Sequence, residues 1–478
     1  MKTRAAVLHD AHKPFEIMEL DLDAPKDGEV LIRYVAAGLC HSDLHLIDGD
    51  LVPRFPIVGG HEGAGIIEEV GPGVTKVKPG DHVVCSFIPN CGTCRYCSTG
   101  RQNLCDMGAT ILEGVMPDGT TRFHSGSTDI GGMCILGTFS ERATISQHSL
   151  VKVDDWLPLE TAVLVGCGVP TGWATANYAG GVRAGDTTVI YGIGGIGINA
   201  VQGAAAAGAK NVVAVDPLAF KRETALKLGA THAFASADEA AAKVNELTWG
   251  QLADQALVTV GTVEEEVVTS AFNVIGKGGT VVITGLANPE KLTVHVSGGV
   301  MTLFEKTIKG TLFGSANPQY DIVKLLRLYD AGQLKLDELV TTRYTLDQVN
   351  EGYQDLRDGK NIRGVIVYDT NLRAGQLVKA VARSAAVASA ARWSSTVANP
   401  APMVLTDMCV APAACHCRSR SASSSGSPRQ LTRPSRPMRA GSRPAARAAA
   451  STCRRASSRP GPGGSCGNQP SARRPARW

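Results

Sequence analysis

The first 150 residues alternate short apolar runs with breaks rich in glycine and proline. Apolar runs at 30–35, 64–70 and 82–87 have the length of β-strands, and Gly-Pro-Gly at 71–73 and Pro-Gly-Asp at 79–81 separate them. Glycine and proline interrupt regular structure and favour turns. The pattern therefore predicts a β-rich, barrel-like unit with long loops.

Beyond about residue 170 the pattern changes to apolar strands that alternate with helices. Strands are expected at 188–191, 212–216, 255–260, 280–284 and 308–313, and helices at 196–207, 220–228 and 264–274. Such alternation predicts a parallel, doubly wound sheet. Two further helices are expected at 321–331 and 346–357, and a final strand at 364–368. The predicted fold class is α/β, with a β-rich unit preceding the doubly wound sheet.

Composition sets residues 371–478 apart from the rest of the chain. This segment holds 17 Arg, one Lys and a single acidic residue, a net charge of +17, whereas the other residues carry 30 basic and 43 acidic groups, or −13. It contains no Glu, Ile, Phe or Tyr. Such a composition cannot bury a core and predicts disorder. The alternative interpretations are a basic tail that binds nucleic acid or a partner, an inert extension, and an out-of-frame translation of GC-rich DNA.

Length and apolar runs restrict the class of protein further. The 478 residues have room for two or three domains. The first ten residues are polar and lack the apolar core of a secretory signal, and no apolar stretch reaches the roughly 18 residues of a membrane span. Clustered cysteines without a secretory signal favour a reducing compartment. We therefore expect a cytoplasmic protein without a membrane segment.

Four cysteines, Cys91, Cys94, Cys97 and Cys105, lie within 15 residues of sequence. Four thiolates at this spacing can surround one metal ion, and sulfur ligands favour zinc or iron–sulfur centres. A bacterial iron–sulfur run places its last cysteine three residues on, before a proline, whereas here seven residues intervene and Asp106 follows. The spacing predicts zinc, with a disulfide cluster or uncoordinated thiols as alternatives. Four sulfurs fill every zinc position, so we expect this site to stabilise a loop.

Gly192, Gly194, Gly195 and Gly197 form a Gly-x-Gly-Gly-x-Gly sequence between an expected strand and an expected helix. In a dinucleotide-binding turn, the first glycine permits the tight turn, the second lets the backbone approach a pyrophosphate, and the last allows close helix packing. The helix N-terminus supplies unpaired N–H groups for the phosphates. A glycine-rich packing turn is the alternative.

Asp216 ends the next expected strand, 19 residues beyond Gly197. A carboxylate there can accept hydrogen bonds from both hydroxyls of the adenosine ribose and would repel a 2′-phosphate, which favours NAD over NADP. Lys221 is expected to approach the same ribose, with a solvated lysine on the helix surface as the alternative.

Three separate segments carry further residue types that bind zinc. Cys40 begins a Cys-His-Ser-Asp-Leu-His run, His61 lies in a glycine-flanked His-Glu pair, and Cys167 lies between two glycines. Each is ambiguous alone, because single cysteines and histidines are more often structural. Together they supply two sulfurs and one nitrogen, a ligand set that leaves a fourth zinc position open for water or substrate.

With these motifs in view, residues 1–370 resemble the zinc-dependent medium-chain alcohol dehydrogenases. The matching motifs are C-H-S-D-L-H at 40–45, G-H-E at 60–62, the cysteine quartet, G-C-G-x-x-T-G at 166–172, G-x-G-G-x-G at 192–197 and N-I-R-G at 361–364. The segments at 246–251 and 310–318 are similar to an actinobacterial subgroup assayed with an artificial nitroso electron acceptor. That similarity implies a slowly released NAD(H).

The resemblance implies a role for each residue of the metal cluster. Cys40, His61 and Cys167 match the ligands of the catalytic zinc, and Glu62 matches a nearby carboxylate that can visit the metal. Asp43 matches the partner that fixes the tautomer of His61.

The resemblance also implies residues for substrate, proton and cofactor. Ser42 matches the hydroxyl that touches the substrate oxygen, and His45 matches the outer member of a proton relay through the nicotinamide ribose. His41 and Arg363 occupy positions expected to contact the pyrophosphate, and Thr171 lies where a side chain packs behind the nicotinamide.

The family further implies the domains, the cofactors and the reaction. We expect a GroES-like catalytic domain at 1–168 and 314–370 and a Rossmann domain at 169–313. One catalytic zinc and one structural zinc are expected in each subunit, together with NAD. The reaction would be the reversible oxidation of primary alcohols to aldehydes by hydride transfer to NAD. The expected partners are a small alcohol or aldehyde, an external electron acceptor and further copies of the chain, without a membrane or nucleic acid.

Two competing functions follow from the same residues. A thiol-adduct formaldehyde dehydrogenase has this fold, but relatives that use glutathione carry arginine four residues beyond the last quartet cysteine, where this chain has Ala109. A non-catalytic NAD-binding protein would lack the zinc ligands, and all three are present. Nucleic-acid binding is suggested only by the basic tail. Phe87 is expected to line the substrate pocket and Trp173 to lie near the cofactor turn, with simple packing as the alternative for each.

Overall fold

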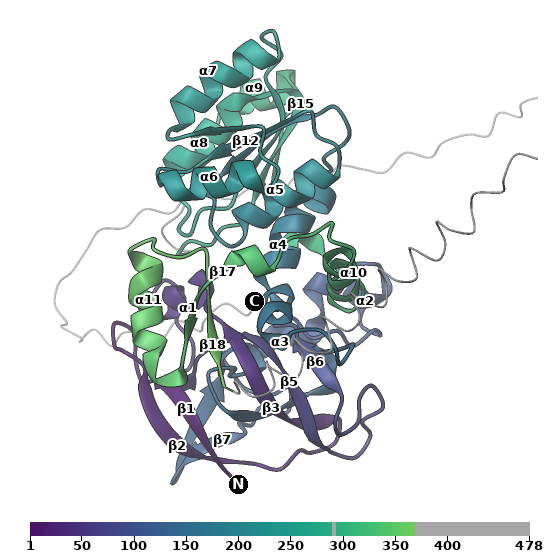
Figure 1. Ribbon diagram of the computed structural model, residues 1–478, viewed down its shortest axis with the longest axis vertical. Helices are drawn as coiled ribbons and strands as arrows, with labels where there is room; N and C mark the ends of the chain where they lie inside the picture. Colours follow the sequence, from purple (N-terminus) through teal and green to yellow (C-terminus); the bar gives the residue numbers. More distant parts are fainter. Residues whose placement is uncertain (289–292, 369–478) are drawn as a thin grey trace, which may run out of the picture. The chain divides into compact units, whose positions relative to one another are not determined.

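The computed structural model describes residues 1–288 and 293–368, all of which belong to one compact unit (Figure 1). The segment 371–478 lies outside the described residues, so its disorder, its binding roles and its origin as an artefact stay predictions. None of the helices in the described ranges has the length and apolar character needed to cross a membrane.

The N-terminal part of the chain forms two sheets. A closed barrel has the strand order β1-β2-β7-β8-β4. Its strands are β1 (Lys2–Leu8), β2 (Glu16–Leu22), β7 (Phe123–Ser125), β8 (Thr128–Gly132) and β4 (Ile57–Val58). A second sheet has the order β10-β6-β5-β3-β18-β17, and β9 also pairs with β3. Its strands are β10 (Leu150–Val153), β6 (His82–Cys85), β5 (Glu62–Val70), β3 (Glu29–Gly38), β18 (Arg363–Val367), β17 (Val340–Tyr344) and β9 (Arg142–Ser146).

The C-terminal strand returns to the N-terminal sheet. β18 pairs antiparallel with β3, with Val365 opposite Gly38 and Val367 opposite Ala36 (Figure 1). Before it, the chain passes through α10 (Pro318–Asp330) and α11 (Val349–Arg357). This pairing brings residues near 363 beside residues near 40, although more than 300 positions separate them in sequence.

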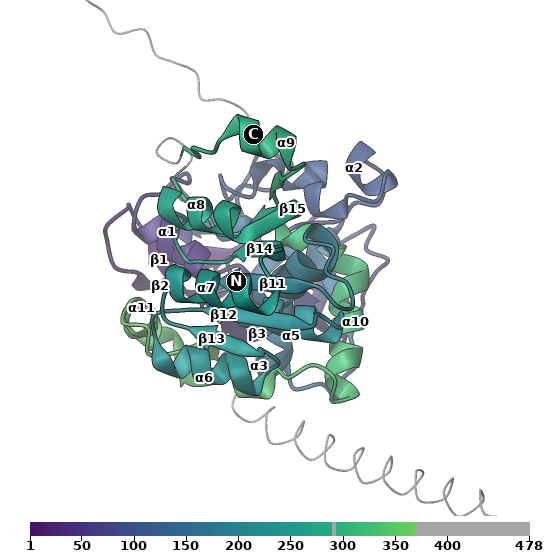
Figure 2. The ribbon, with the colours of Figure 1, turned by 90° about the horizontal axis from the view of Figure 1, so that it is seen from above.

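The middle of the chain forms a six-stranded sheet with the order β13-β12-β11-β14-β15-β16, and every neighbouring pair is parallel. Its strands are β11 (Thr187–Tyr191), β12 (Asn211–Val215), β13 (His232–Phe234), β14 (Ala253–Val258), β15 (Ile275–Ile283) and β16 (Thr307–Gly310). Its helices are α5 (Gly197–Ala206), α6 (Ala219–Lys227), α7 (Ala237–Leu247), α8 (Glu265–Val274) and α9 (Gly298–Leu303) (Figure 2). After β11, the strands β12 and β13 are added on one side of it, whereas β14, β15 and β16 are added on the other side. In such folds, this change of side opens a ligand crevice at the carboxyl ends of the strands.

Small residues let the helices approach the sheet and each other closely. Ala200, Val201 and Ala204 on α5 belong to the same buried core as Ile190 on β11. On α4 (Gly168–Ala174), a Cβ added to Gly172 would lie 2.0 Å from the carbonyl oxygen of Ile196. Glycine and alanine on these helices therefore allow α4 to lie directly against the start of α5.

The predicted α/β fold is confirmed, with a correction at one strand. The strand expected at 308–313 ends at Gly310, because the chain turns away and Phe313 adopts a positive φ of 56° in a short 3₁₀ turn, Phe313–Ser315. Other elements differ in extent or were not expected: β6 ends at Cys85, β14 ends at Val258, and α11 begins at Val349 after a 3₁₀ turn. The elements that were not expected include β13, α4, α7 and α9. Most residues of α7 are polar or alanine, and only Ala240 and Val244 are buried. Two buried positions give an apolar periodicity too weak to predict a helix.

A buried ion pair fixes the start of β3. The Arg122 guanidinium contacts the Glu29 carboxylate through Nη2 to Oε1 at 2.5 Å and Nε to Oε2 at 2.9 Å. Both residues are buried, with 3% and 6% of their surfaces exposed. A two-point contact of this kind combines charge with fixed geometry. It therefore ties the loop before β7 to the strand that leads toward Cys40.

We predict that Arg122→Ala lowers the free energy of unfolding by about 3–5 kcal/mol, because it leaves the Glu29 charge buried without its partner. Lys2→Ala is the matched control, since the 2.9 Å Lys2–Asp21 pair is exposed on both sides and should be worth less than about 1 kcal/mol. Urea denaturation followed by circular dichroism measures both. Equal losses in the two variants would contradict the structural role of the buried pair.

Candidate active site and metal centres

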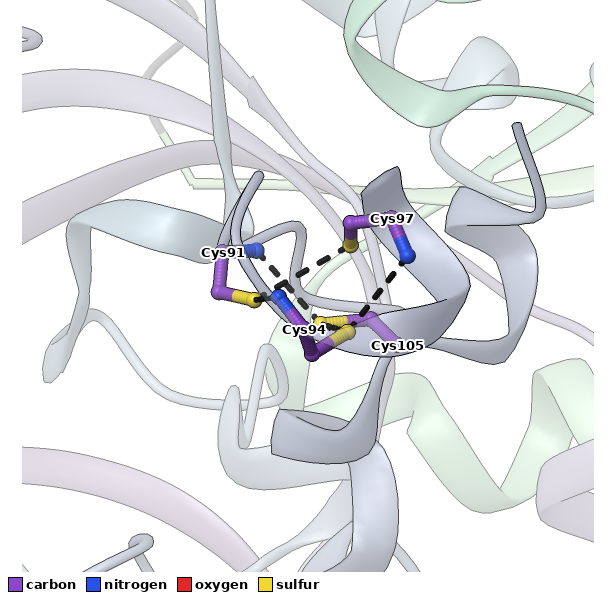
Figure 3. Close-up of side chains that lie close together, drawn as sticks. All are labelled: Cys91, Cys94, Cys97 and Cys105. Atoms are coloured by element: carbon purple, nitrogen blue, oxygen red, sulfur yellow. Dashed lines mark hydrogen bonds between the residues drawn. The ribbon is translucent and has the colours of Figure 1, made fainter. Parts of the chain in front are cut away.

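The predicted cysteine quartet gathers into one cluster around α2 (Arg95–Ser98) (Figure 3). Its sulfurs lie within 4.8 Å of one another, with 3.9 Å between Cys91 and Cys97 and 4.0 Å between Cys94 and Cys105. Zinc–sulfur bonds of about 2.3 Å imply sulfur–sulfur separations of about 3.8 Å in a tetrahedron. The cluster thus has the size of a four-thiolate zinc site.

Backbone N–H groups point at the sulfurs of the quartet. The N–H groups of Cys94 and Cys97 donate to Cys91 Sγ at 3.3 Å and to Cys94 Sγ at 3.4 Å (Figure 3). The N–H group of Thr93 also donates to Cys91 Sγ, at 3.5 Å. Partial burial acts to raise the pKa of Cys91, but these N–H groups outweigh it and lower that pKa to about 6. Because the thiolate is the form that binds metal, these donors favour the metal-binding form of Cys91, whereas burial raises the pKa of Cys97 and Cys105.

A second cluster brings together ligand atoms from Cys40, His61, Glu62 and Cys167, all buried and within 4.8 Å of one another. Cys40 precedes α1 (His41–Ile47), His61 immediately precedes β5, and Cys167 immediately precedes α4. Three segments distant in sequence therefore meet at the starts of one strand and two helices. The predicted ligand set is brought together as expected.

His61 is held so that one of its ring nitrogens has no protein partner. Its Nδ1 lies 3.3 and 3.2 Å from the two carboxylate oxygens of Asp43, which also accepts the N–H of Gly60 at 3.0 Å. The other nitrogen, Nε2, is buried and has no hydrogen-bond partner. An orphaned nitrogen beside two cysteine sulfurs fits a zinc ion, with Asp43 as the carboxylate that orients the imidazole.

The two cysteines of this cluster shift each other's pKa in opposite directions. A hydrogen bond from the Cys167 thiol lowers the pKa of Cys40 well below its usual value, against the effect of burial and with help from His61. The same contact raises the pKa of Cys167 well above its usual value. A metal ion binds thiolates, so its binding to both sulfurs would release the proton of the Cys167 thiol.

Glu62 and Arg363 form a buried ion pair between the metal cluster and the glycine turn. Arg363 Nη2 donates to Glu62 Oε2, and the Arg363 Nε is buried without a partner. Burial raises the pKa of the Glu62 carboxyl to about 7, although the guanidinium opposes the shift. A Cβ added to Gly195 would lie 2.7 Å from Arg363 Nη1. One arginine therefore touches both the carboxylate near the cysteines and the predicted phosphate turn.

A cavity of about 430 Å³ opens between the metal cluster and the glycine turn. Gly192 has a φ of +86°, and a Cβ added to Gly197 would lie 1.9 Å from the Gly192 carbonyl oxygen. A Cβ added to Gly194 would meet nothing within 4 Å, so the turn is open toward the cavity. The glycines occupy the positions that tight turning and close packing require, and the orphaned Arg363 Nε fits an anionic phosphate group.

Asp216 and Lys221 both line this cavity. The Asp216 carboxylate accepts the N–H of Ile193 at 2.8 Å and that of Leu218 at 2.9 Å. Asp216 thus braces the glycine turn, a contact that sequence did not predict. Each carboxylate oxygen keeps a further lone pair for a ribose hydroxyl.

The remaining predicted residues also line the cavity. His41 packs on the backbone of Gly261, whose added Cβ would lie 2.6 Å from the His41 ring, and burial lowers the pKa of His41. Thr171 Oγ1 donates to the Cys167 carbonyl at 2.6 Å. Ser42 Oγ lies 3.8 Å from Cys40 Sγ. His45 also lines the cavity, and its Nδ1 lies 3.0 Å from Asp50 Oδ2.

The aromatic wall of the cavity was only half predicted. Phe87 lines it as expected and meets His61 and Phe313 edge-on, at ring separations of 5.8 and 5.4 Å. The sequence analysis places Phe313 at the end of a strand and does not predict that it lines the cavity. The only sequence signal for such a role is its position in the G-T-L-F-G-S segment. Trp173 packs in the hydrophobic core and does not line the cavity.

Comparison with known proteins identifies the family. Residues 26–155 match the alcohol dehydrogenase GroES-like domain, and residues 195–331 match the zinc-binding dehydrogenase domain. An NDMA-dependent alcohol dehydrogenase of Amycolatopsis methanolica is 85% identical over 371 residues, which are 78% of this chain and all of that protein. The chain belongs to the zinc-dependent medium-chain alcohol dehydrogenases.

Two more distant alcohol dehydrogenases share the same framework. Alcohol dehydrogenase B of Mycobacterium tuberculosis is 46% identical over 370 residues, 77% of this chain and 99% of that protein. The crystal structure of benzyl alcohol dehydrogenase from Acinetobacter calcoaceticus is 30% identical, with a TM-score of 0.72 over 77% of this chain and 100% of that chain. This alcohol dehydrogenase therefore binds zinc and acts on small molecules.

We predict that Cys97→Ser removes about one zinc equivalent per chain and lowers the melting temperature, because a structural zinc contributes folding free energy. Cys134→Ser is the matched control, since Cys134 is a free cysteine outside both clusters. Elemental analysis by mass spectrometry and thermal melts measure the two quantities. Unchanged zinc content in Cys97→Ser would contradict the site.

Proposed function

We propose that this alcohol dehydrogenase oxidises primary alcohols to aldehydes with NAD, and that each chain binds one catalytic and one structural zinc. The carrying observation is the buried, unpartnered Nε2 of His61 beside Cys40 and Cys167, next to a cavity that ends at a dinucleotide turn. The four-sulfur cluster leaves no position for substrate, so we infer that it is the structural site.

Cys40, His61 and Cys167 would hold the catalytic zinc, which when bound polarises the alcohol oxygen and lowers the pKa of its hydroxyl. Asp43 keeps the His61 ring in one orientation and tautomer. Phe87 stacks edge-on against His61 and helps to exclude water from the reacting centre.

Asp216, the glycine turn and Arg363 would hold NAD, which when bound accepts the hydride. Support comes from the open backbone at Gly194 and from the unpartnered Nε of Arg363. His41, which packs beside this region, adds a second nitrogen donor for the pyrophosphate. The buried carboxylate of Asp216 favours NAD over a cofactor with a 2′-phosphate.

Ser42 and His45 would move the proton that the alcohol loses. Both lie on α1, three residues apart, and such neighbours share one helix face. The Ser42 hydroxyl lines the cavity beside Cys40, where a substrate oxygen would sit. His45 follows it toward the outside of the protein.

The division into domains and the electron acceptor complete the proposal. The return of β17 and β18 to the sheet of β3 supports a catalytic domain at 1–168 and 314–370 around a Rossmann domain at 169–313. The 85% identical relative named as NDMA-dependent supports a cofactor that stays bound and is reoxidised by an external acceptor.

A substrate panel tests this function. Purified protein should oxidise primary alcohols with NDMA as acceptor without added NAD, and heat-denatured protein should release about one NAD(H) per chain. Absorbance at the NDMA band and chromatography of the released nucleotide measure these results. Activity confined to formaldehyde–thiol adducts, or the absence of nucleotide and of any NAD-dependent rate, would contradict the proposal.

We predict that Cys40→Ser and His61→Ala each abolish alcohol oxidation, because either change removes a ligand of the catalytic zinc. The quartet should retain its zinc in both variants, so zinc should fall by about one equivalent per chain while the fold stays intact. Steady-state rates, elemental analysis and circular dichroism measure these outcomes. A variant with verified loss of that zinc and a near-normal rate would contradict the ligand assignment.

A further inference from the structure

His45 is buried, yet both of its ring nitrogens face oxygen atoms. Nε2 lies 3.0 Å from the carbonyl oxygen of Gly261, which lines the cofactor cavity. Nδ1 lies 3.0 Å from Oδ2 of Asp50. The side chain of His45 is 3% exposed and that of Asp50 is 24% exposed. The imidazole thus spans from the cavity wall to a carboxylate that reaches solvent.

Asp50 lines a second hollow, which is distinct from the cofactor cavity lined by the glycine turn. This second hollow, of about 250 Å³, is lined by Asp50, Thr262, Glu264 and Glu265, and none of these four lines the cofactor cavity. His45 is therefore the bridge between the two hollows. A proton that reaches its ring from the cavity has an outlet on the opposite side.

The contacts of His45 match the state of a ring that has received a proton. Carbonyl and carboxylate oxygens only accept hydrogen bonds, so both contacts are satisfied when both ring nitrogens carry hydrogen. The surrounding geometry therefore suits the imidazolium that forms as the alcohol loses its proton. From there, Nδ1 can pass its hydrogen directly to Asp50.

We propose that Asp50 positions His45 and takes the reaction's proton from it to solvent, an inference that rests on the proposed alcohol oxidation. The proton of the substrate hydroxyl passes through Ser42 to the His45 ring. Nδ1–H then transfers to the Asp50 carboxylate, which leaves a neutral ring and a neutral carboxyl. The carboxyl releases the proton to water, so one proton reaches the bulk for each alcohol oxidised.

Other charged groups near His45 lack this placement. The His41 ring, on the same helix, lies edge-on to the His45 ring at a centroid separation of 5.2 Å. Burial and the positive charge of Lys221, on α6, lower the pKa of His41. Asp48, two residues before Asp50, is engaged by Arg357 at 2.5 Å. In the second hollow, Glu265 contacts His295 at 2.6 Å. Within residues 1–288 and 293–368, Asp50 is the carboxylate in hydrogen-bond contact with His45.

Asp50→Asn tests the role, because asparagine keeps the size and a hydrogen-bonding oxygen but cannot accept the proton. We expect kcat for alcohol oxidation to fall about 10–100-fold with KM nearly unchanged, and its solvent deuterium isotope effect to rise. Formate or acetate should restore part of the rate in Asp50→Ala. Asp48→Asn, a neighbouring carboxylate change without contact to His45, should behave as the wild type.

A second measurement does not depend on turnover. In ¹⁵N-histidine NMR spectra, the His45 ring signals, identified with His45→Gln, should shift in Asp50→Asn and stay in place in Asp48→Asn. Equal kcat and isotope effects in the two variants, or unchanged His45 signals in Asp50→Asn, would overturn the role of Asp50. A wild-type protein that oxidises no alcohol would instead overturn the proposed function, which keeps the two failures distinct.

Discussion

Nε2 of His61 is buried without a hydrogen-bond partner, and a buried polar atom left in this state costs about 1–3 kcal/mol. The fold maintains it by fixing the other side of the ring: Asp43 accepts from Nδ1 and from the backbone of Gly60. Cys40 and Cys167 approach from two further segments. A metal ion would give this nitrogen a partner, because it can bind the nitrogen and both sulfurs together. The rest of the site is organised around that position.

The pairing of β18 with β3 connects that metal site to the nucleotide turn. It brings Arg363 next to Glu62 on one side and Gly195 on the other. Loss of glycine at 195 would force a Cβ into the guanidinium. The same side chain can therefore respond to an anion at the turn and to the charge of the carboxylate near the cysteines. This one ion pair therefore lies between the candidate metal ligands and the glycine turn.

Local patterns predicted much of the fold and most of the candidate site. Gly192 to Gly197 required a tight turn before a helix, and the quartet spacing allowed one tetrahedral cluster, because both features depend on residues close in sequence. Phe313 was misplaced because its backbone turns at a positive φ that no local pattern of apolar residues indicates. Asp50 passed unnoticed because its partner His45 is fixed only when α1 packs against the Gly261 loop.

The sequence by itself determined the ligand types, the dinucleotide turn and the alternation of strands and helices, since these follow from residue chemistry and short-range spacing. Only the tertiary structure decided that the ligand atoms of Cys40, His61 and Cys167 lie together, that Arg363 joins Glu62 to Gly195, and that the His45 ring lies between Asp50 and the Gly261 carbonyl. Each of these contacts joins separate segments. Their geometry depends on how sheets and helices pack, which local pattern does not encode.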